Sequence, residues 1–235
     1  IAIFVLLIGG FLGVTTKTGA LDAGIGSVVE KLQGKELILI PVLMFVFSLG
    51  GTSFGMAEET IAFTALVTTT MIVAGFDPLV SVGTIILGAG SGVLGSTVNP
   101  FLVSTSIGAL KGVGIEVNQV IVIATGIALW LSSLLISIYF VMKYAKSLQK
   151  DKKATLLSQK EINEANETFL GKKNSEEVVE FTTKRRIVLG LFALTFVVMV
   201  AAVIPWEEFG VTIFSKTDFL TGSSLGSWWF SELGM

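Results

Sequence analysis

Two apolar stretches of this chain are each interrupted by a short polar segment that is rich in small residues. Residues 48–60 read SLGGTSFGMAEET, and residues 94–100 read LGSTVNP. Hydrocarbon holds no water that could satisfy free backbone groups, and each unpaired N–H or C=O there costs several kcal/mol. Irregular backbone at membrane depth is therefore tolerated only where protein buries it or where it lines a watery cavity. Two such breaks in succession predict the binding site of a transporter.

The composition is that of a polytopic membrane protein. Hydrophobic residues make up 52% of the 235 residues and charged residues only 14%, which lies outside the range of ordinary soluble domains. Residues 78–110, 117–142 and 187–206 contain no charged side chain, and each stretch is long enough to cross a bilayer. We therefore expect an all-α, multi-pass membrane protein, with the lipid bilayer as a partner.

Missing residue types exclude several kinds of site. The chain has no cysteine and no histidine, which excludes disulfides, thiolate metal sites, HExxH zinc sites and histidine proton relays. Its basic residues cluster in one loop rather than along a binding face, so we expect no nucleic-acid partner. We expect no metal site and no cofactor beyond a coupling Na+ or H+, with a small molecule as the substrate.

The first segment, residues 1–36, is predicted to hold the end of a transmembrane helix followed by an arm helix at residues 20–33. One apolar stripe at helical spacing is formed by Leu21, Ile25, Val28, Val29 and Leu32. Such a stripe is typical of a helix that lies in the membrane interface. A helix packed on the protein's own surface would show the same stripe, and both interpretations make it a connector.

Residues 37–116 are predicted to form part of a transport domain, beginning with a hairpin at residues 37–74. The apolar arms at residues 37–49 and 61–74 are each about 20 Å long as helix, against a hydrocarbon core of about 30 Å. Two short helices with a glycine-rich tip predict a re-entrant hairpin. The alternative is two full spans, with Glu58 and Glu59 in an external turn.

A second part of this domain, residues 78–110, is predicted to be one span broken at residues 95–99. Pro100 removes a backbone donor and biases Asn99 away from helical geometry, which favours a break between helices at 78–93 and 100–110. The alternative is a simple proline kink.

Gly90, Gly92 and Gly95 fit a GxGxxG pattern, but no βαβ unit surrounds them. We interpret the glycines at 88, 92 and 95 as places where helices or a ligand approach the backbone closely.

The remaining chain divides into three segments. Residues 117–143 are predicted to be an uninterrupted transmembrane helix. Residues 144–186 are predicted to be a cytoplasmic loop, because residues 143–186 hold 11 of the 16 Lys and Arg residues. Residues 187–235 are predicted to be a transmembrane helix and an interfacial segment that leads to a second repeat. We expect the chain to be part of a larger transporter, since it begins inside an apolar run.

The candidate binding residues of the first polar segment supply flexible backbone, hydroxyls and carboxylates. They are Gly51, Thr52, Ser53, Glu58 and Glu59. Gly51 and its neighbour Gly50 permit unwound backbone. A charge at the bilayer centre costs at least about 2.5–3.5 kcal/mol, so an acidic pair there implies a partner such as a substrate amine, a sodium ion or a proton.

The candidates of the second polar segment are Ser96, Thr97, Asn99 and Pro100. Helix N-termini at such a break carry exposed N–H groups and partial positive charge, which suit a carboxylate. Freed carbonyls suit a cation, and an amino acid carries both kinds of group. No Lys or Arg lies within the apolar spans, so a substrate carboxylate would depend on N–H, hydroxyl and amide donors.

Three stretches of the chain resemble the C4-dicarboxylate anaerobic carrier family, and in particular its YfcC branch. They read GGFLGVTTKTGALDAGI, FSLGGTSFGMAEE and GSTVNPF, and the similarity is close over residues 1–144. Arginine/ornithine antiporters of some fermenting bacteria resemble the same branch.

The resemblance implies the architecture of the ion-transporter superfamily, in which two inverted repeats each hold a re-entrant hairpin and a discontinuous helix within an elevator-like transport domain. It matches residues 48–60 to the hairpin tip, residues 95–100 to the unwound helix and residues 20–33 to the arm helix. This chain would then hold the first repeat, and the full-length protein would be a homodimer.

Together with the resemblance, which implies the elevator type, these observations predict a secondary active antiporter of a small amino acid in the bacterial inner membrane, and no enzyme. Glu58 and Glu59 favour a basic amino acid such as arginine or ornithine, because they could meet a side-chain cation. A C4-dicarboxylate or another small carboxylate is the alternative substrate. A channel is a rival class, because broken helices also build selectivity filters, and saturable flux would distinguish a carrier from it. An intramembrane protease would lack a Ser–His dyad here, and a purely structural subunit would not need two polar interruptions.

Overall fold

The computed structural model describes residues 10–11, 13–15, 17–32, 34–99, 102–171, 180–204, 206 and 210–214. All regular elements within these ranges are helices, which confirms the all-α prediction. The α-helices are α2 (Ala20–Lys31), α3 (Glu36–Phe54), α4 (Thr64–Val73), α5 (Pro78–Gly95), α6 (Leu102–Gly112), α7 (Gln119–Lys150), α8 (Gln159–Gly171) and α9 (Thr183–Val203). Two 3-10 helices, η1 (Glu58–Phe63) and η2 (Lys152–Ala154), connect α3 to α4 and α7 to α8.

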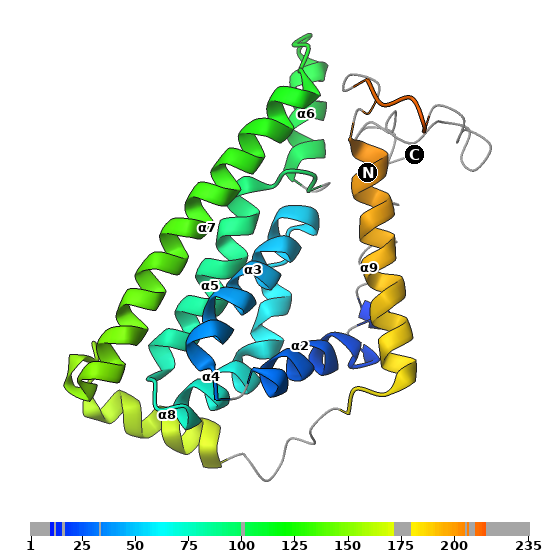
Figure 1. Ribbon diagram of the computed structural model, residues 1–235. Coiled ribbons are helices and arrows are strands. Elements are labelled where there is room, and N and C mark those ends of the chain that lie inside the picture. Colours follow the sequence, from blue (N-terminus) through cyan, green and yellow to red (C-terminus); the bar gives the residue numbers. More distant parts are fainter. Residues whose placement is uncertain are drawn as a thin grey trace.

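Helices α3, α5 and α7 pack along one another at the centre of the fold, and α5 contacts both of the others (Figure 1). The largest fully buried side chain is Phe47 of α3, which contacts the ring of Phe63. Within the described ranges, the three stretches long and apolar enough to cross a membrane are Leu37–Phe54, Pro78–Gly95 and Gln119–Lys150. These stretches belong to the same three helices.

Glycines allow the backbones of these helices to approach closely. A Cβ atom added at Gly92 would lie 2.1 Å from the carbonyl oxygen of Ser48 on α3, and one at Gly88 would lie 2.9 Å from the Cα atom of Met44. At Gly95 the added atom would collide with α7 instead. The obstructing atoms on α3 belong to the backbone and cannot rotate away, so these positions admit no larger residue. The interpretation of the three glycines as close-packing positions is confirmed.

Helix α7 extends further than the apolar stretch that predicted it. It continues to Lys150, and α8 also lies within residues 144–186, so part of the predicted loop is helical. Hydrogen bonds to the Asp77 carboxylate connect the end of α7 to the start of α5. One carboxylate oxygen of Asp77 caps α5 by accepting from the N–H of Val80 (3.2 Å), and the other accepts from the hydroxyls of Tyr144 and Thr155.

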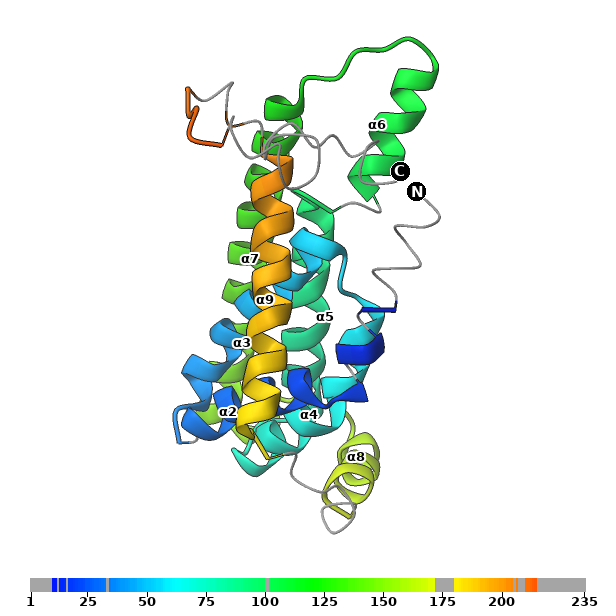
Figure 2. The same ribbon diagram turned by 90° about the vertical axis from the view of Figure 1, so that its right-hand side faces the viewer.

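Helix α2 crosses the lower ends of the bundle and contacts α9 (Figures 1 and 2). Its predicted apolar stripe packs against the core of the protein, with Ile25 and Val29 buried. Packing on the core is compatible with both arrangements that the sequence left open. Arg185 of α9 donates from Nε to the carbonyl oxygen of Thr18 just before α2 (3.1 Å). Burial raises the pKa of the Asp22 carboxyl on this helix, and a backbone hydrogen bond and the charge of Arg185 partly offset the rise.

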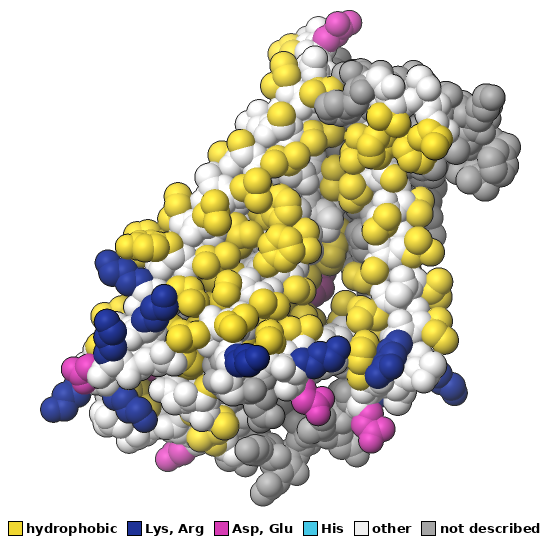
Figure 3. All heavy atoms as spheres, in the orientation of Figure 1, with side chains coloured by type: hydrophobic (Ala, Val, Ile, Leu, Met, Phe, Trp, Pro, Cys, Tyr) yellow, Lys and Arg dark blue, Asp and Glu magenta, His cyan; other side chains and the backbone are white. Residues whose placement is uncertain are grey.

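The visible surface is divided by residue type. Lys and Arg side chains gather at the lower end of the molecule, and the flank above them is largely apolar (Figure 3). On α7, Leu135, Ile136 and Phe140 are each more than half exposed. A contiguous apolar surface of this kind is unusual in a soluble monomer. It agrees with a protein that is embedded in a membrane.

Candidate functional site

The first polar segment turns the chain back towards the end of the bundle from which α3 starts. Helix α3 ends at Phe54, and Gly55 follows in the left-handed region with φ 82°. The chain then returns through η1 to α4, which lies at the same end as the start of α3 (Figures 1 and 2). Glycine closes the helix because it adopts this conformation without a Cβ penalty.

The expectation that Gly50 and Gly51 unwind the backbone is wrong. Both residues lie inside α3. A Cβ atom at Gly51 would lie 2.4 Å from the carbonyl oxygen of Ala89, and one at Gly50 would lie 2.6 Å from the Sδ atom of Met56. Their small size is used for close packing rather than for backbone freedom. The irregular part of the segment begins later, at Gly55.

The second polar segment separates α5 from α6. Residues 96–99 are not helical, and Ser96 has φ 38° and ψ 49°. This left-handed conformation costs a non-glycine residue of order 1–3 kcal/mol and persists only where the surroundings impose it. The predicted discontinuity is therefore a break of several residues rather than a simple proline kink. Pro100 itself lies outside the described residues.

The two polar segments converge on a pair of buried threonines. The hydroxyl oxygens of Thr52 on α3 and Thr97 in the break lie 3.1 Å apart. The N–H of Thr97 donates to the hydroxyl of Thr52 (3.1 Å), and the N–H of Val98 donates to the carbonyl oxygen of Thr52 (3.4 Å). The upper end of α3 thus satisfies backbone groups that the break in α5 has freed from helical bonding.

Asn99 connects the break to the turn that follows α3. The side chain is 1% exposed. It donates from Nδ2 to the hydroxyl of Ser96 (3.2 Å), and its Oδ1 accepts from the N–H of Leu102 (3.4 Å) at the start of α6. A Cβ atom at Gly55 would lie 2.8 Å from Nδ2 of Asn99. The amide therefore fills the space between the two polar segments.

The remaining candidate residues either form hydrogen bonds within their own segment or have side chains that the structure does not describe. The hydroxyl of Ser53 donates to the carbonyl oxygen of Leu49 within its own helix (2.6 Å). A carboxylate oxygen of Glu59 accepts from the N–H of Ala57 (3.2 Å) and so closes the turn before η1. Glu58 begins η1, and its side chain is outside the described residues. The structure thus brings together Gly51, Thr52, Ser96, Thr97 and Asn99.

Two residues of α7 border the break and were not predicted. A Cβ atom at Gly126 would lie 2.6 Å from the carbonyl oxygen of Gly95 and 3.1 Å from the Cα atom of Thr97. Trp130, one turn later, packs its Cβ against Gly95, and its buried indole Nε1 has no hydrogen-bond partner among the described residues. The sequence feature that could have identified these two residues is a single glycine, one turn before a tryptophan, within an apolar span.

The chemistry of the described site is that of neutral donors and acceptors. Threonine and serine hydroxyls, the Asn99 amide and backbone groups of the break converge. Within the described ranges, no group of three or more Asp, Glu, His or Cys side chains is placed to hold a metal ion.

Replacing Thr52 by valine should destabilise the protein by about 1–3 kcal/mol, because the buried N–H of Thr97 loses its acceptor. The matched control is Thr195→Val. That hydroxyl is exposed and, among the described residues, bonds to the carbonyl oxygen of Leu191 in its own helix, so we expect a change within about 0.5 kcal/mol. Thermal unfolding of the purified variants measures both effects. Equal unfolding midpoints for the two variants would mean that the threonine contact does not hold the segments together.

Comparison with known proteins places the chain in a family. The sequence pattern of the C4-dicarboxylate anaerobic carrier family matches residues 1–235. A protein of Escherichia coli (strain K12) named "Putative basic amino acid antiporter YfcC" is 32% identical over 218 residues, which is 91% of this chain and 38% of that protein. An uncharacterized protein of Haemophilus influenzae is 26% identical over 234 residues, which is 99% of this chain and 41% of that protein.

The chain spans about two fifths of the length of these two relatives. No solved structure gives a significant match. The family match nevertheless covers the whole chain, and the described ranges hold three helices long and apolar enough to cross a membrane. The chain therefore belongs to the C4-dicarboxylate anaerobic carrier family.

Proposed function

We propose that this protein is part of a secondary active antiporter for a small basic amino acid such as arginine or ornithine. The observation that carries the proposal is the contact between Thr52 and Thr97, which joins two polar interruptions of apolar helices. A structural membrane protein gains nothing from two such interruptions, whereas a carrier needs irregular backbone that can meet a substrate.

The polar groups suit a zwitterion. A substrate carboxylate would take over donors that now bond within the site, namely the N–H of Thr97, the threonine hydroxyls and the Asn99 amide. Glu58 and Glu59 supply negative charge for an amino group or a cationic side chain, and Glu59 is half-buried beside the turn that follows α3. The name of the Escherichia coli relative, a basic amino acid antiporter, supports the same substrate class.

The proposed architecture is the first of two inverted repeats. Residues 37–74 form its re-entrant hairpin, and α5 and α6 form its discontinuous helix. The shortness of α4, an apolar helix of 10 residues that is too short to cross a bilayer, supports the hairpin. A second repeat would supply the other half of the binding site. The transport domain would move as an elevator within a homodimer, driven by exchange or by a coupled Na+ or H+.

A C4-dicarboxylate is the second candidate substrate. The description of the family as C4-dicarboxylate carriers favours it, and so do the N–H and hydroxyl donors that surround the break. Uptake by liposomes that contain the full-length protein, measured with arginine, ornithine and fumarate, separates the two substrates. Exchange of arginine for ornithine without an ion gradient supports the antiporter. Saturable fumarate uptake without any arginine exchange would contradict the antiporter proposal and support a dicarboxylate carrier.

Glu58→Gln should lower arginine exchange by about 10- to 100-fold, because a hydrogen bond to a charged group is worth about 1.5–3 kcal/mol. The control is Glu164→Gln, which removes the same charge from the exposed face of α8. Initial rates in liposomes, normalised to the amount of inserted protein, measure the effect. Unchanged exchange in Glu58→Gln would remove this carboxylate from the binding site.

A further inference from the structure

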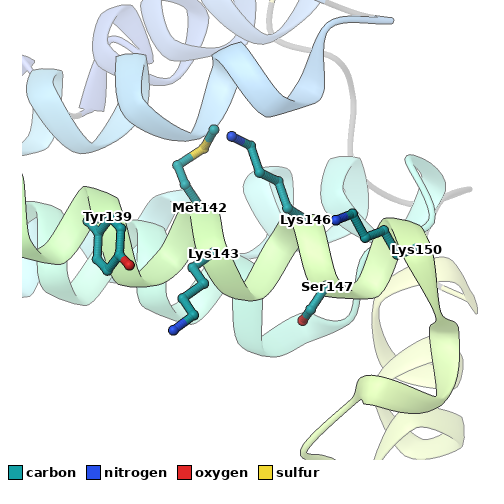
Figure 4. Close-up of a pocket in the computed structure, with 6 residues that line it drawn as sticks. All are labelled: Tyr139, Met142, Lys143, Lys146, Ser147 and Lys150. Atoms are coloured by element: carbon teal, nitrogen blue, oxygen red, sulfur yellow. The ribbon is translucent and has the colours of Figure 1, made fainter.

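A cavity of about 420 Å³ lies along the last third of α7, away from the two polar segments. Its lining is formed by Tyr139, Met142, Lys143, Lys146, Ser147 and Lys150. Figure 4 shows Met142 and Lys146 pointing from α7 toward the neighbouring ribbon of α3, whereas Lys143 points to the other side. The cavity is thus open to the surface, and charged side chains surround it.

The three lysines of this basic cavity form no ion pair with a carboxylate in the described part of the chain. Ion pairing within 4 Å there joins Lys160 to Glu164 and involves none of the three. Lys143, Lys146 and Lys150 are all exposed and span about 10 Å along the helix axis. Like charges on adjacent turns repel one another. A bound anion would relieve that repulsion.

The basic cavity lies where the apolar surface of α7 ends. Leu135 and Ile136, about one turn before Tyr139, and Phe140, which directly follows Tyr139, are 67%, 58% and 59% exposed. Tyr139 lies between the two regions, with the Nζ atom of Lys143 6.0 Å from its ring centroid. Aromatic and basic residues at such a boundary are typical of the headgroup level of a membrane. An anion bound here would have hydrocarbon on one side and water on the other.

We propose that this cavity binds the headgroup of an acidic phospholipid. The lysine ammonium groups contact the phosphate, and the acyl chains lie on the exposed apolar side chains of α7. Ser147 does not donate to the phosphate, because its hydroxyl already donates to the carbonyl oxygen of Tyr144 (2.7 Å). Basic pockets beside membrane helices on the cytoplasmic side recognise anionic headgroups in this way. The bound lipid neutralises the cluster and lies along α7.

Native mass spectrometry of the full-length protein in detergent tests the proposal. We expect phosphatidylglycerol to remain bound in preference to phosphatidylethanolamine. Each Lys→Gln change at positions 143, 146 and 150 should weaken phosphatidylglycerol binding about fivefold, and the triple variant should weaken it on the order of 100-fold. The triple Lys→Arg variant keeps the charge and should keep the binding, which shows that a loss in the glutamine variant is not a folding defect.

The matched control removes the same number of charges elsewhere, at Lys152, Lys153 and Lys160, which lie outside the cavity. This control should retain the preference for phosphatidylglycerol. An equal loss in the control would overturn the proposal in favour of general charge attraction. Equally tight binding of soluble glycerol phosphate would overturn it in favour of a free anion site. The measurement uses no transport substrate, so its outcome is independent of the proposed antiport.

Discussion

Gly92→Ala should abolish transport and destabilise the protein, whereas Gly90→Ala, two residues away on the same helix, should do neither. An alanine Cβ at position 92 would lie 2.1 Å from the carbonyl oxygen of Ser48 and 2.8 Å from the backbone nitrogen of Thr52. Because both are backbone atoms of α3, the two helices must separate. Overpacking of this kind costs about 1–3 kcal/mol. The separation would also part Thr52 from Thr97.

Position 90 provides the control because nothing lies within 4 Å of a Cβ built there. Alanine is preferred over glycine inside a helix by about 0.5–1 kcal/mol, so Gly90→Ala should be neutral or slightly stabilising. Thermal unfolding and liposome uptake of both variants, in the full-length protein, measure the contrast. If Gly92→Ala transports at the wild-type rate, then close contact between α3 and α5 is not required for function.

Asn99→Ala should lower transport at least tenfold while the protein still inserts into the membrane. The amide is buried, starts α6 and contacts Ser96. Its removal leaves a void between the two polar segments and takes away the acceptor for the N–H of Leu102. Loss of an N-terminal cap costs about 0.5–2 kcal/mol on its own. The larger effect on transport follows from the loss of an amide where we place the substrate.

Asn118→Ala separates capping from binding. Asn118 caps α7 in the same way, by accepting from the N–H of Ile121 (3.1 Å), but it is exposed. We expect this variant to lose a comparable amount of stability and to retain transport. Unfolding midpoints and uptake rates for the two variants distinguish the roles. A similar loss of transport in both variants would mean that Asn99 acts only as a structural cap of α6.

The sequence predicted the helical fold, the family and the position of the broken helix. Those predictions depend on local properties. Apolar runs without charge favour helices in a membrane because every backbone group is satisfied inside the element. Pro100 and Asn99 disfavour a continuous helix through steric effects on their own backbone. The glycines at positions 88 and 92 were recognised for the same reason, since their small size is a property of the residue alone.

Properties that depend on which surfaces meet could not be predicted in the same way. Gly51 is compatible with unwound backbone and with close helix packing, and only the approach of Ala89 decides for packing. The stripe of α2 fits a lipid surface as well as a protein core, and its packing on the core was fixed by the neighbouring helices. Gly126 and Trp130 border the break from α7 because of a helix crossing that no local pattern specifies.

The sequence by itself determined that two polar segments interrupt apolar helices, because composition and backbone preference act within a few residues. The tertiary structure decided that these segments meet, through Thr52 and Thr97, which are 45 positions apart in the chain. It also decided which of their groups are used by the fold, as with the hydroxyl of Ser53 and a carboxylate oxygen of Glu59. Hydrogen-bond partners distant in sequence are set by helix packing, and packing depends on the shapes of both surfaces at once.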